Sequence, residues 1–156
     1  MAIGKQQDEW VTITANIGSA CSVTVTEKDV QHRSILGRTR RIPRRDIATV
    51  LYAPRLNTGN NQHGDWLVLL DEHDRPLLRL TSHYIWSHEG IKQVCEAVGG
   101  PTVNMPDTQA RVVGLHYPKA MPYRTAHPNI FGGIIAALLV AVIVVGVIAV
   151  EADSFP

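Results

Sequence analysis

The chain of 156 residues carries 15 Lys or Arg and 14 Asp or Glu, so its formal net charge at pH 7 is only +1. This length allows one domain of roughly 100 residues beside an apolar C-terminal stretch, and therefore a single modest core. The two cysteines, Cys21 and Cys95, lie far apart and have no Cys-x-x-Cys spacing. They exclude a disulfide framework and suit a reducing cytoplasm.

The first half of the chain is expected to form short antiparallel strands joined by tight turns. Residues 10–15 alternate Trp and Thr with Val, Ile and Ala, a period of two that is typical of a strand with one buried face. Gly37 permits a sharp reversal, and Pro43 ends a strand because it has no N–H to donate to a ladder. The same pattern predicts four more strands, at 22–26, 30–35, 38–42 and 47–52.

The middle of the chain predicts an apolar hairpin followed by a helix. Residues 54–65, rich in Asn, Gly and Gln, are expected to form an exposed, mobile loop. Residues 66–70 and 76–80 flank a polar turn and predict a hairpin at the centre of the core. Ser87 is placed to cap a helix that Gly99 stops. Its apolar face is expected to carry Ile91, Val94, Cys95 and Val98.

The C-terminal part predicts a connector and a transmembrane helix. Residues 101–128 hold five prolines and no sustained period, so an extended connector that packs partly on the domain or on the membrane surface is expected. Residues from Ile130 to Val150 contain no charged, amide or hydroxyl side chain, and at about 1.5 Å per residue they would span roughly the 30 Å hydrocarbon layer. Lys119 and Arg124 precede this stretch, whereas acids follow it, which places the N-terminal domain in the cytoplasm and the C-terminus outside.

The expected protein is therefore a single-pass protein of the plasma membrane. Its predicted parts are a cytoplasmic domain at 10–99, a Pro-containing connector at 100–129, a transmembrane helix at 130–150 and a short outer tail at 151–156.

Several turn and strand patterns carry a resemblance to a known family. They are VTVTEKDV at 23–30, GRTRRIPRRDI at 37–47, LLDEHDRPLL at 69–78, Trp86 at the entry to the helix, and YRTAHP at 123–128. These patterns resemble the bacterial pleckstrin-homology-like (PH-like) domains of small actinobacterial membrane proteins. The resemblance implies a mainly β fold, a bent antiparallel sheet or barrel closed by one α-helix, ahead of the transmembrane helix. It also implies a binding or scaffolding module without conserved catalytic residues.

A cluster of arginines is the main candidate for a binding site. The stretch 33–45 holds six arginines and no acid, and several of them could converge on one rim of the sheet. Because guanidinium groups suit phosphate and carboxylate, the rim could bind anionic lipid or an acidic partner. The alternative is a solvated rim paired with Asp46, Asp71, Glu72 and Asp74. Nucleic acid is disfavoured because the cluster has no aromatic residue. The predicted site residues are Arg33, Arg38, Arg40, Arg41, Arg44 and Arg45.

Neither a metal site nor catalytic chemistry is expected. The seven histidines show no ligand pair on one element, and neither cysteine has a histidine nearby in the sequence. The group at 71–74 has residue types for acid–base work but is interpreted as a hairpin tip. We therefore predict no cofactor and no enzyme activity.

Small residues in the apolar stretch predict helix packing. Gly132, Gly133, Ala136, Ala137 and Ala141 would let a second helix approach closely. The leading functional hypothesis is an adaptor that contacts a protein partner or anionic lipid at the cytoplasmic membrane face. An accessory subunit or assembly factor of a larger membrane complex, held through the helix as a homo-oligomer or with a partner, is the second hypothesis. An enzyme acting at the membrane surface is the third.

Overall fold

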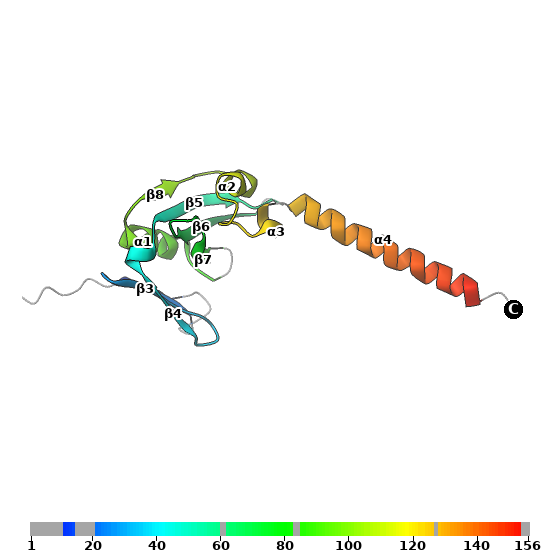
Figure 1. The fold of residues 1–156 in the computed structure, drawn as a ribbon, viewed down its shortest axis with the longest axis horizontal. Coiled ribbons are helices and arrows are strands. Elements are labelled where there is room, and N and C mark those ends of the chain that lie inside the picture. The colour runs from blue at the N-terminus through cyan, green and yellow to red at the C-terminus, as the bar shows by residue number, and fades with distance from the viewer. Residues whose placement is uncertain (1–10, 15–20, 60–61, 83–84, 127, 154–156) are drawn as a thin grey trace, which may run out of the picture.

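The computed structural model describes residues 11–14, 21–59, 62–82, 85–126 and 128–153 (Figure 1). Trp10 and Ala15, the ends of the first predicted strand, lie outside these residues. The strands are β1 (Val11–Thr14), β2 (Ser22–Val25), β3 (Asp29–Arg33), β4 (Thr39–Pro43), β5 (Thr49–Asn57), β6 (His63–Leu70), β7 (Pro76–Thr81) and β8 (Thr102–Asn104). The helices are a 3₁₀ turn η1 (Arg44–Asp46), α1 (His88–Val98), α2 (Ala110–His116), α3 (Tyr123–Ala126) and α4 (Pro128–Asp153).

The first sheet is an antiparallel meander in the order β1-β2-β3-β4. Its buried side chains recur with a period of two, as expected for a strand that packs on one face only. Ile13, Val23 and Val30 face the core, and Ile42 continues this face on β4. The outer face carries Thr and charged residues.

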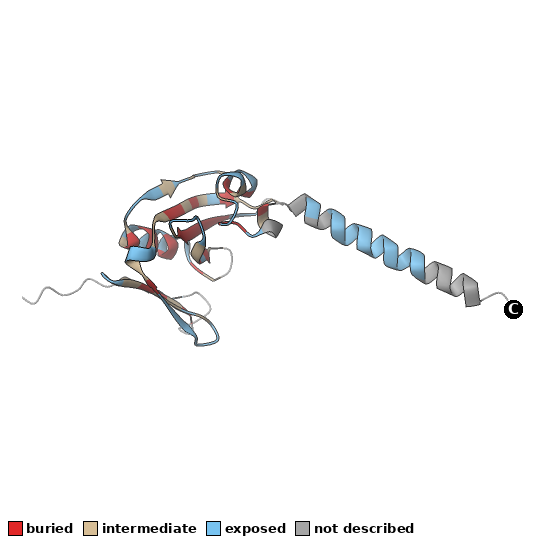
Figure 2. Cartoon of the chain, viewed as in Figure 1, coloured by how far each residue is buried: buried red, intermediate tan, exposed pale blue. Residues whose placement is uncertain are grey.

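The second sheet has the order β7-β6-β5-β8, and it is buried on both faces. β8 runs parallel to β5, whereas the other pairs are antiparallel. Every residue of β6 from Gly64 to Leu70 is buried, which fits a continuous apolar run rather than an alternating one (Figure 2). A strand of this kind needs cover on both sides.

Two cores provide that cover. The inner core lies between the two sheets and α1 and includes Val50, Leu67, Leu69 and Ile91. The outer core lies on the opposite face of the second sheet. It contains Leu51, Ala53, Leu56, Trp66, Val68, Leu70, Ala110, Val113, Ala120, Met121 and Ala126.

The predicted fold class was therefore wrong. The chain is not a mainly β sheet or barrel with one closing helix, but a mixed fold with two four-stranded sheets and additional helices. The segment at 100–129 was predicted to be an extended connector, yet it contains β8, α2 and α3. The physical reason is that β5 and β6 place apolar side chains on both faces, so the Pro-containing segment folds back to cover the outer one.

The exposed loop predicted at 54–65 was also wrong in most of its length. β5 continues to Asn57 and β6 begins at His63, with an irregularity in the register between Ala53 and Leu56. Pro54 and Arg55 form this bulge, where a missing N–H is tolerated.

The helix predicted between Ser87 and Gly99 was confirmed. Ser87 Oγ accepts a hydrogen bond from the Gly90 N–H at 3.0 Å, which caps the first turn of α1. Ile91, Val94, Cys95 and Val98 are buried on one face of α1. Gly99 ends the helix with φ of 61°, a conformation that favours glycine.

The predicted transmembrane helix is contradicted. α4 (Pro128–Asp153) covers the stretch in which the span was predicted. Within the described part of the chain, no helix combines the length and apolarity that a membrane crossing requires. This finding overturns the predicted single-pass location in the plasma membrane, with its cytoplasmic domain and outer C-terminus, and the membrane class assigned to the protein.

Candidate binding groove

The six arginines of the predicted site do not converge on one rim. Ile42 is buried, so the alternation of β4 places Arg40 on the inner face and Arg41 on the outer face. The same alternation places Arg33 on the outer face of β3, because Val30 and His32 face inward. Arg38 lies exposed in the turn between these strands.

Arg44 supports the fold instead of presenting a free charge. Its guanidinium donates hydrogen bonds to the carbonyls of Ala97 and Val98 at the end of α1, and to Thr26 O at 3.3 Å. A cation at this position satisfies carbonyls that lack partners and complements the negative end of the helix dipole. Arg45, by contrast, is exposed, and its Nε lies 3.6 Å from Asp46 Oδ1.

Replacing Arg44 by Gln should lower the free energy of unfolding by about 2 kcal/mol, because three carbonyls lose a charged donor. Arg45→Gln is the matched control, and its exposed ion pair should contribute less than about 1 kcal/mol. Urea denaturation of both variants measures the difference. Equal effects of the two substitutions would remove the capping role of Arg44.

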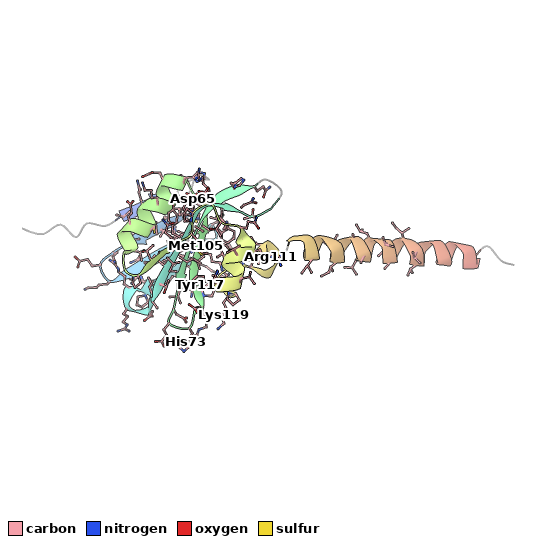
Figure 3. The ribbon with its side chains drawn as sticks, turned by 90° about the horizontal axis from the view of Figure 1, so that it is seen from above. Asp65, His73, Met105, Arg111, Tyr117 and Lys119 are labelled. Carbon is pink, nitrogen blue, oxygen red and sulfur yellow. The ribbon has the colours of Figure 1, made fainter. Side chains whose placement is uncertain are left out.

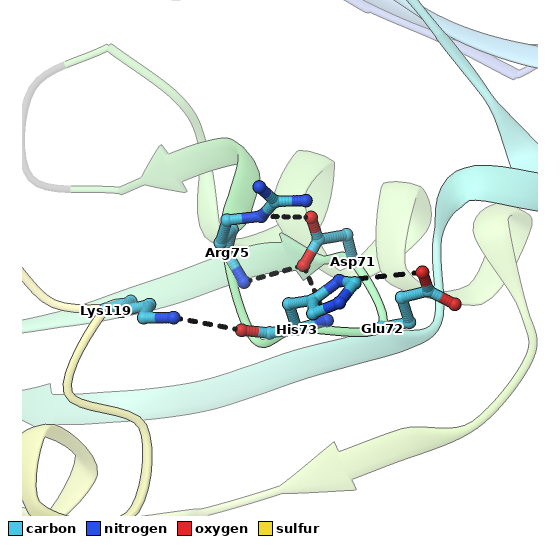
Figure 4. A network of polar contacts seen from close by, with 5 residues as sticks. All are labelled: Asp71, Glu72, His73, Arg75 and Lys119. Atoms are coloured by element: carbon cyan, nitrogen blue, oxygen red, sulfur yellow. Dashed lines mark hydrogen bonds and ion pairs between the residues drawn. The ribbon is translucent and has the colours of Figure 1, made fainter.

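Two of the acids proposed as partners of the arginine rim, Asp71 and Glu72, form contacts within the β6–β7 hairpin tip instead (Figure 4), whereas Asp46 lies beside Arg45. Asp71 Oδ2 accepts from Arg75 Nε at 2.8 Å, and its Oδ1 accepts from the backbone N–H groups of Arg75 and His73. Glu72 Oε1 lies 3.5 Å from His73 Nδ1. These contacts stabilise the turn and support the interpretation of residues 71–74 as a hairpin tip.

The Asp71 carboxyl should titrate at about pH 2. Hydrogen bonds from the backbone of Arg75 and His73, and from the Arg75 side chain, lower its pKa from 3.8 to about 2. The stability that Asp71 provides is therefore fully present above its ordinary pKa and is lost as the pH falls through about 2. Carbon-detected NMR of the carboxyl group measures this midpoint, and Arg75→Gln should raise it. A midpoint near 3.8 in the unmodified chain would contradict the hydrogen-bonded geometry.

An open, mainly apolar cavity lies between the β3–β4 hairpin and β7. It has a volume of about 330 Å³ and is walled by Trp86, Ile85 and the hairpin tip at Ile35 and Leu36. A second depression of about 240 Å³ adjoins it, because both share His32 and Arg79. We call the two together the β4–β7 groove; its lining residues are Cys21, His32, Ser34, Ile35, Leu36, Arg40, Pro76, Leu77, Leu78, Arg79, Thr81, Ile85 and Trp86.

The charge of the β4–β7 groove is positive. Arg40 and Arg79 are its charged residues, and no acid is among the described residues that line it. Arg79 pairs with Val68 of the outer core, and its guanidinium is engaged on that face, where Nε donates to Ala120 O at 2.8 Å and an NH2 group donates to Lys119 O at 2.7 Å. Arg40 is exposed, so its guanidinium is available for an anion.

His32 and Cys21 are held in their neutral forms within this groove. Burial and the nearby Arg40 charge lower the pKa of His32 below 6.5, and burial raises the pKa of the Cys21 thiol. The Cys21 Sγ lies 4.0 Å from His32 Nε2, and the His32 and Trp86 rings are tilted against each other with centroids 6.4 Å apart. A thiol with a raised pKa is a poor nucleophile, so this pair does not form an activated dyad.

A second polar cluster surrounds the buried Asp65, which is 5% exposed. Its Oδ1 accepts from the Arg55 backbone N–H at 2.9 Å, and its Oδ2 lies 3.1 Å from His88 Nδ1 and 3.4 Å from the Tyr52 hydroxyl. Burial and the Asp65 charge raise the pKa of Tyr52 to about 12. Figure 3 shows Asp65 at the opposite end of the folded domain from His73.

The contacts of Asp65 serve to stabilise the fold. Ser82 Oγ and Asp65 Oδ2 both approach the same nitrogen of His88, Nδ1, whereas a catalytic triad needs its acid and its nucleophile on opposite ring nitrogens. Asp65 instead satisfies the N–H of Arg55, whose φ of 53° belongs to the bulge of β5. It fixes the bulge and joins it to the start of α1.

The small residues predicted for helix packing all lie in α4. Ala136, Ala137 and Ala141 are exposed, and the space around Gly133 is open. Gly132 belongs to α4, but its surroundings lie outside the described residues. The neighbouring Leu138 and Val142 are 62% and 69% exposed.

The histidines are dispersed, and the described residues contain no group of three or more His, Cys, Asp or Glu side chains that could hold a metal ion. His83 and His127 lie outside the residues that the structure describes. Comparisons with protein-family models, with curated proteins and with solved structures found no match to this chain.

Sequence reasoning identified Arg40 but missed most of the groove around it. His32, Arg79 and Trp86 come from three separate elements, and only the packing of the two sheets brings them together. The sequence contained one signal of the groove, because Ile35 and Leu36 are apolar residues in a turn between arginines. They are 57% and 83% exposed.

Proposed function

We propose that this chain is a non-catalytic binding protein, an adaptor whose folded domain holds an acidic segment of a protein partner in the β4–β7 groove. The carrying observation is the combination of an exposed Arg40 and an adjoining apolar cavity without an acidic residue among its described lining. Such a site selects carboxylates next to an apolar side chain.

The distribution of the arginines favours a protein partner over an anionic lipid surface. A flat anionic surface attracts basic residues that share one face. Here Arg40 and Arg41 lie on opposite faces of β4, Arg44 caps α1 and Arg45 pairs with Asp46. The proposal also agrees with the binding role implied by the PH-like resemblance, which stays a prediction.

The geometry gives little support to catalysis. The volume of about 330 Å³ is at the small end of the range for small-molecule sites, roughly 300 to 1,000 Å³. Cys21 and His32, the titratable groups within it, are both shifted toward unreactive neutral forms.

The test measures the binding of two short blocked peptides to the full-length chain by fluorescence anisotropy. Both peptides carry one central Leu, and they differ only in having Glu or Lys at alternate positions. The Glu peptide should bind more tightly, and Arg40→Gln should weaken it by about tenfold, which corresponds to about 1.4 kcal/mol. Arg41→Gln, on the outer face of the same strand, is the matched control. Equal binding of the two peptides, or equal effects of the two variants, would contradict the proposed function.

Binding of the Glu peptide should strengthen as the pH falls from about 7 to about 6. In the free chain, partial burial of the His32 ring and the nearby Arg40 charge disfavour its protonated form. Cys21, Arg79 and Trp86 also line the groove around this ring. A bound carboxylate would raise the pKa of His32, so the complex takes up a proton in this range. Affinity measured against pH should follow this course in the unmodified chain and be flat in His32→Gln. A pH dependence that survives in His32→Gln would exclude His32 as its source.

The exposed apolar side chains of α4 favour a second function, that of a subunit assembled through this helix. Ile134, Leu138, Leu139 and Ile143 are each at least about half exposed and lie on different sides of the helix. A helix that is apolar all round is normally buried, and one neighbour cannot cover it, so we expect a bundle of α4 helices from several copies. Leu138→Asp should reduce the sedimenting particle to a single chain. A single chain without the substitution, or an unchanged assembly with it, would remove this alternative.

A further inference from the structure

The β4–β7 groove lies between two strands that end their sheets. β4 is the last strand of the first sheet and β7 the last strand of the second. No other described strand lies beside the outer edge of either one. An end strand presents a row of backbone N–H and C=O groups along that edge, which can pair with an added strand.

Other end strands of the fold are less suitable for such pairing. β8 has three residues and is intermediate or exposed throughout, and β1 has four. β7 spans six residues, and its side chains line both parts of the groove. An added strand along β7 would therefore lie beside the apolar cavity and Arg40.

The two parts of the groove follow one another along β7. One part is lined by Pro76, Leu77 and Leu78 together with Arg40, and the other by Thr81 together with Trp86. Side chains on one face of an extended strand recur about every 6 to 7 Å, which is two residues. One extended segment can thus place an apolar side chain beside Trp86 and an acidic side chain at Arg40, two or four positions apart.

We infer that the partner segment is an extended strand that pairs with the outer edge of β7 from Leu77 to Arg79, inserts one apolar side chain into the cavity beside Trp86, and places a carboxylate at Arg40. This inference rests on the proposed function and names the shape of its ligand. The charge of the groove supports an acidic segment, because its described lining carries arginines and no acid. Ile35 and Leu36 are both exposed at the hairpin tip and both line the cavity, and this adjoining apolar pair supports the apolar anchor, since contiguous exposed apolar surface marks contact sites.

The test uses the full-length chain and the Glu peptide with its central Leu, in two N-methylated forms. One form carries N-methyl groups on the odd positions and the other on the even positions. Because alternate N–H groups of a strand point to opposite edges, only one of the two forms can still pair with β7. We expect one form to bind like the parent peptide and the other to lose at least about tenfold in affinity. Equal affinities of the two forms would overturn the strand-addition inference.

The apolar anchor is tested from both sides. Replacing the central Leu of the peptide by Ser should weaken binding several-fold, and Leu36→Ser in the protein should do the same. Leu115→Ser is the matched control, because Leu115 is 70% exposed and lies on α2, outside the groove. Neither exposed substitution should change the melting temperature, so lost folding cannot imitate lost binding. A Leu36→Ser chain that binds as well as Leu115→Ser would contradict the anchor.

The outcomes separate this inference from the proposed function. Dependence on Arg40 and on Glu, combined with equal binding of both N-methylated forms, would leave the acidic-partner proposal standing and overturn strand addition. Loss of the Arg40 dependence would overturn both. The free chain could instead form a dimer through the β7 edges of two copies. If the peptide failed to dissociate such a dimer, the inference would be overturned, because a second copy would occupy the groove.

Discussion

Val113→Asp should lower the free energy of unfolding by more than about 3 kcal/mol. Val113 lies in α2, is fully buried, and belongs to the outer core with Leu51 and Val68. A carboxylate at this position would lose its water without gaining a charged partner or a set of hydrogen bonds. Substitutions that bury an unpaired charge are among the most destabilising known.

Leu115→Asp is the control for this prediction, since Leu115 lies two residues further along α2 and is 70% exposed. It should change the free energy of unfolding by about 0.5 kcal/mol or less. Guanidinium denaturation of the full-length chain measures both values. If Val113→Asp were as stable as Leu115→Asp, the segment at 110–126 would not cover the second sheet, and the outer core would be wrong.

Asp65→Ala should lower the free energy of unfolding by about 3 kcal/mol. The substitution removes the acceptor of the Arg55 backbone N–H and the partner of Tyr52 and His88. A buried donor that loses its acceptor costs about 1 to 3 kcal/mol, and the Asp65 carboxylate also fixes the bulge of β5.

The matched control for Asp65 is Asp107→Asn. Asp107 Oδ2 lies 2.6 Å from an Arg55 guanidinium nitrogen, but both side chains are exposed, so this ion pair should contribute about 1 kcal/mol or less. Thermal and urea denaturation give the two differences. A loss for Asp107→Asn as large as that for Asp65→Ala would show that the side chain of Arg55, rather than its backbone N–H, anchors the bulge.

The sequence predicted local elements better than their arrangement. The period of two in β2 and β3 and the cap at Ser87 are local signals, and the structure confirmed them. The outer core could not be predicted in this way. The run from Trp66 to Leu70 indicated a buried strand, and the Pro-containing segment was expected to pack partly on the domain, but neither pattern indicated that this segment would form helices that cover the strand.

The candidate site shows the same limit. Proximity in sequence suggested that six arginines would act together, whereas the alternation of β4 separates Arg40 from Arg41, and the end of α1 recruits Arg44. The contributions of Arg79 and Trp86 depend on how the two sheets pack. Asp65 was placed in an exposed loop because the bulge at Pro54 and Arg55 interrupts the strand pattern on which that prediction depended.

The most direct test of the β4–β7 groove is a map of NMR chemical-shift changes in the full-length chain on addition of the Glu peptide. We predict that the largest changes fall on His32, Arg40, Arg79 and the Trp86 indole, which line the groove. Changes confined to Arg33 and Arg41 on the outer face of the first sheet would contradict the groove and restore the predicted arginine rim.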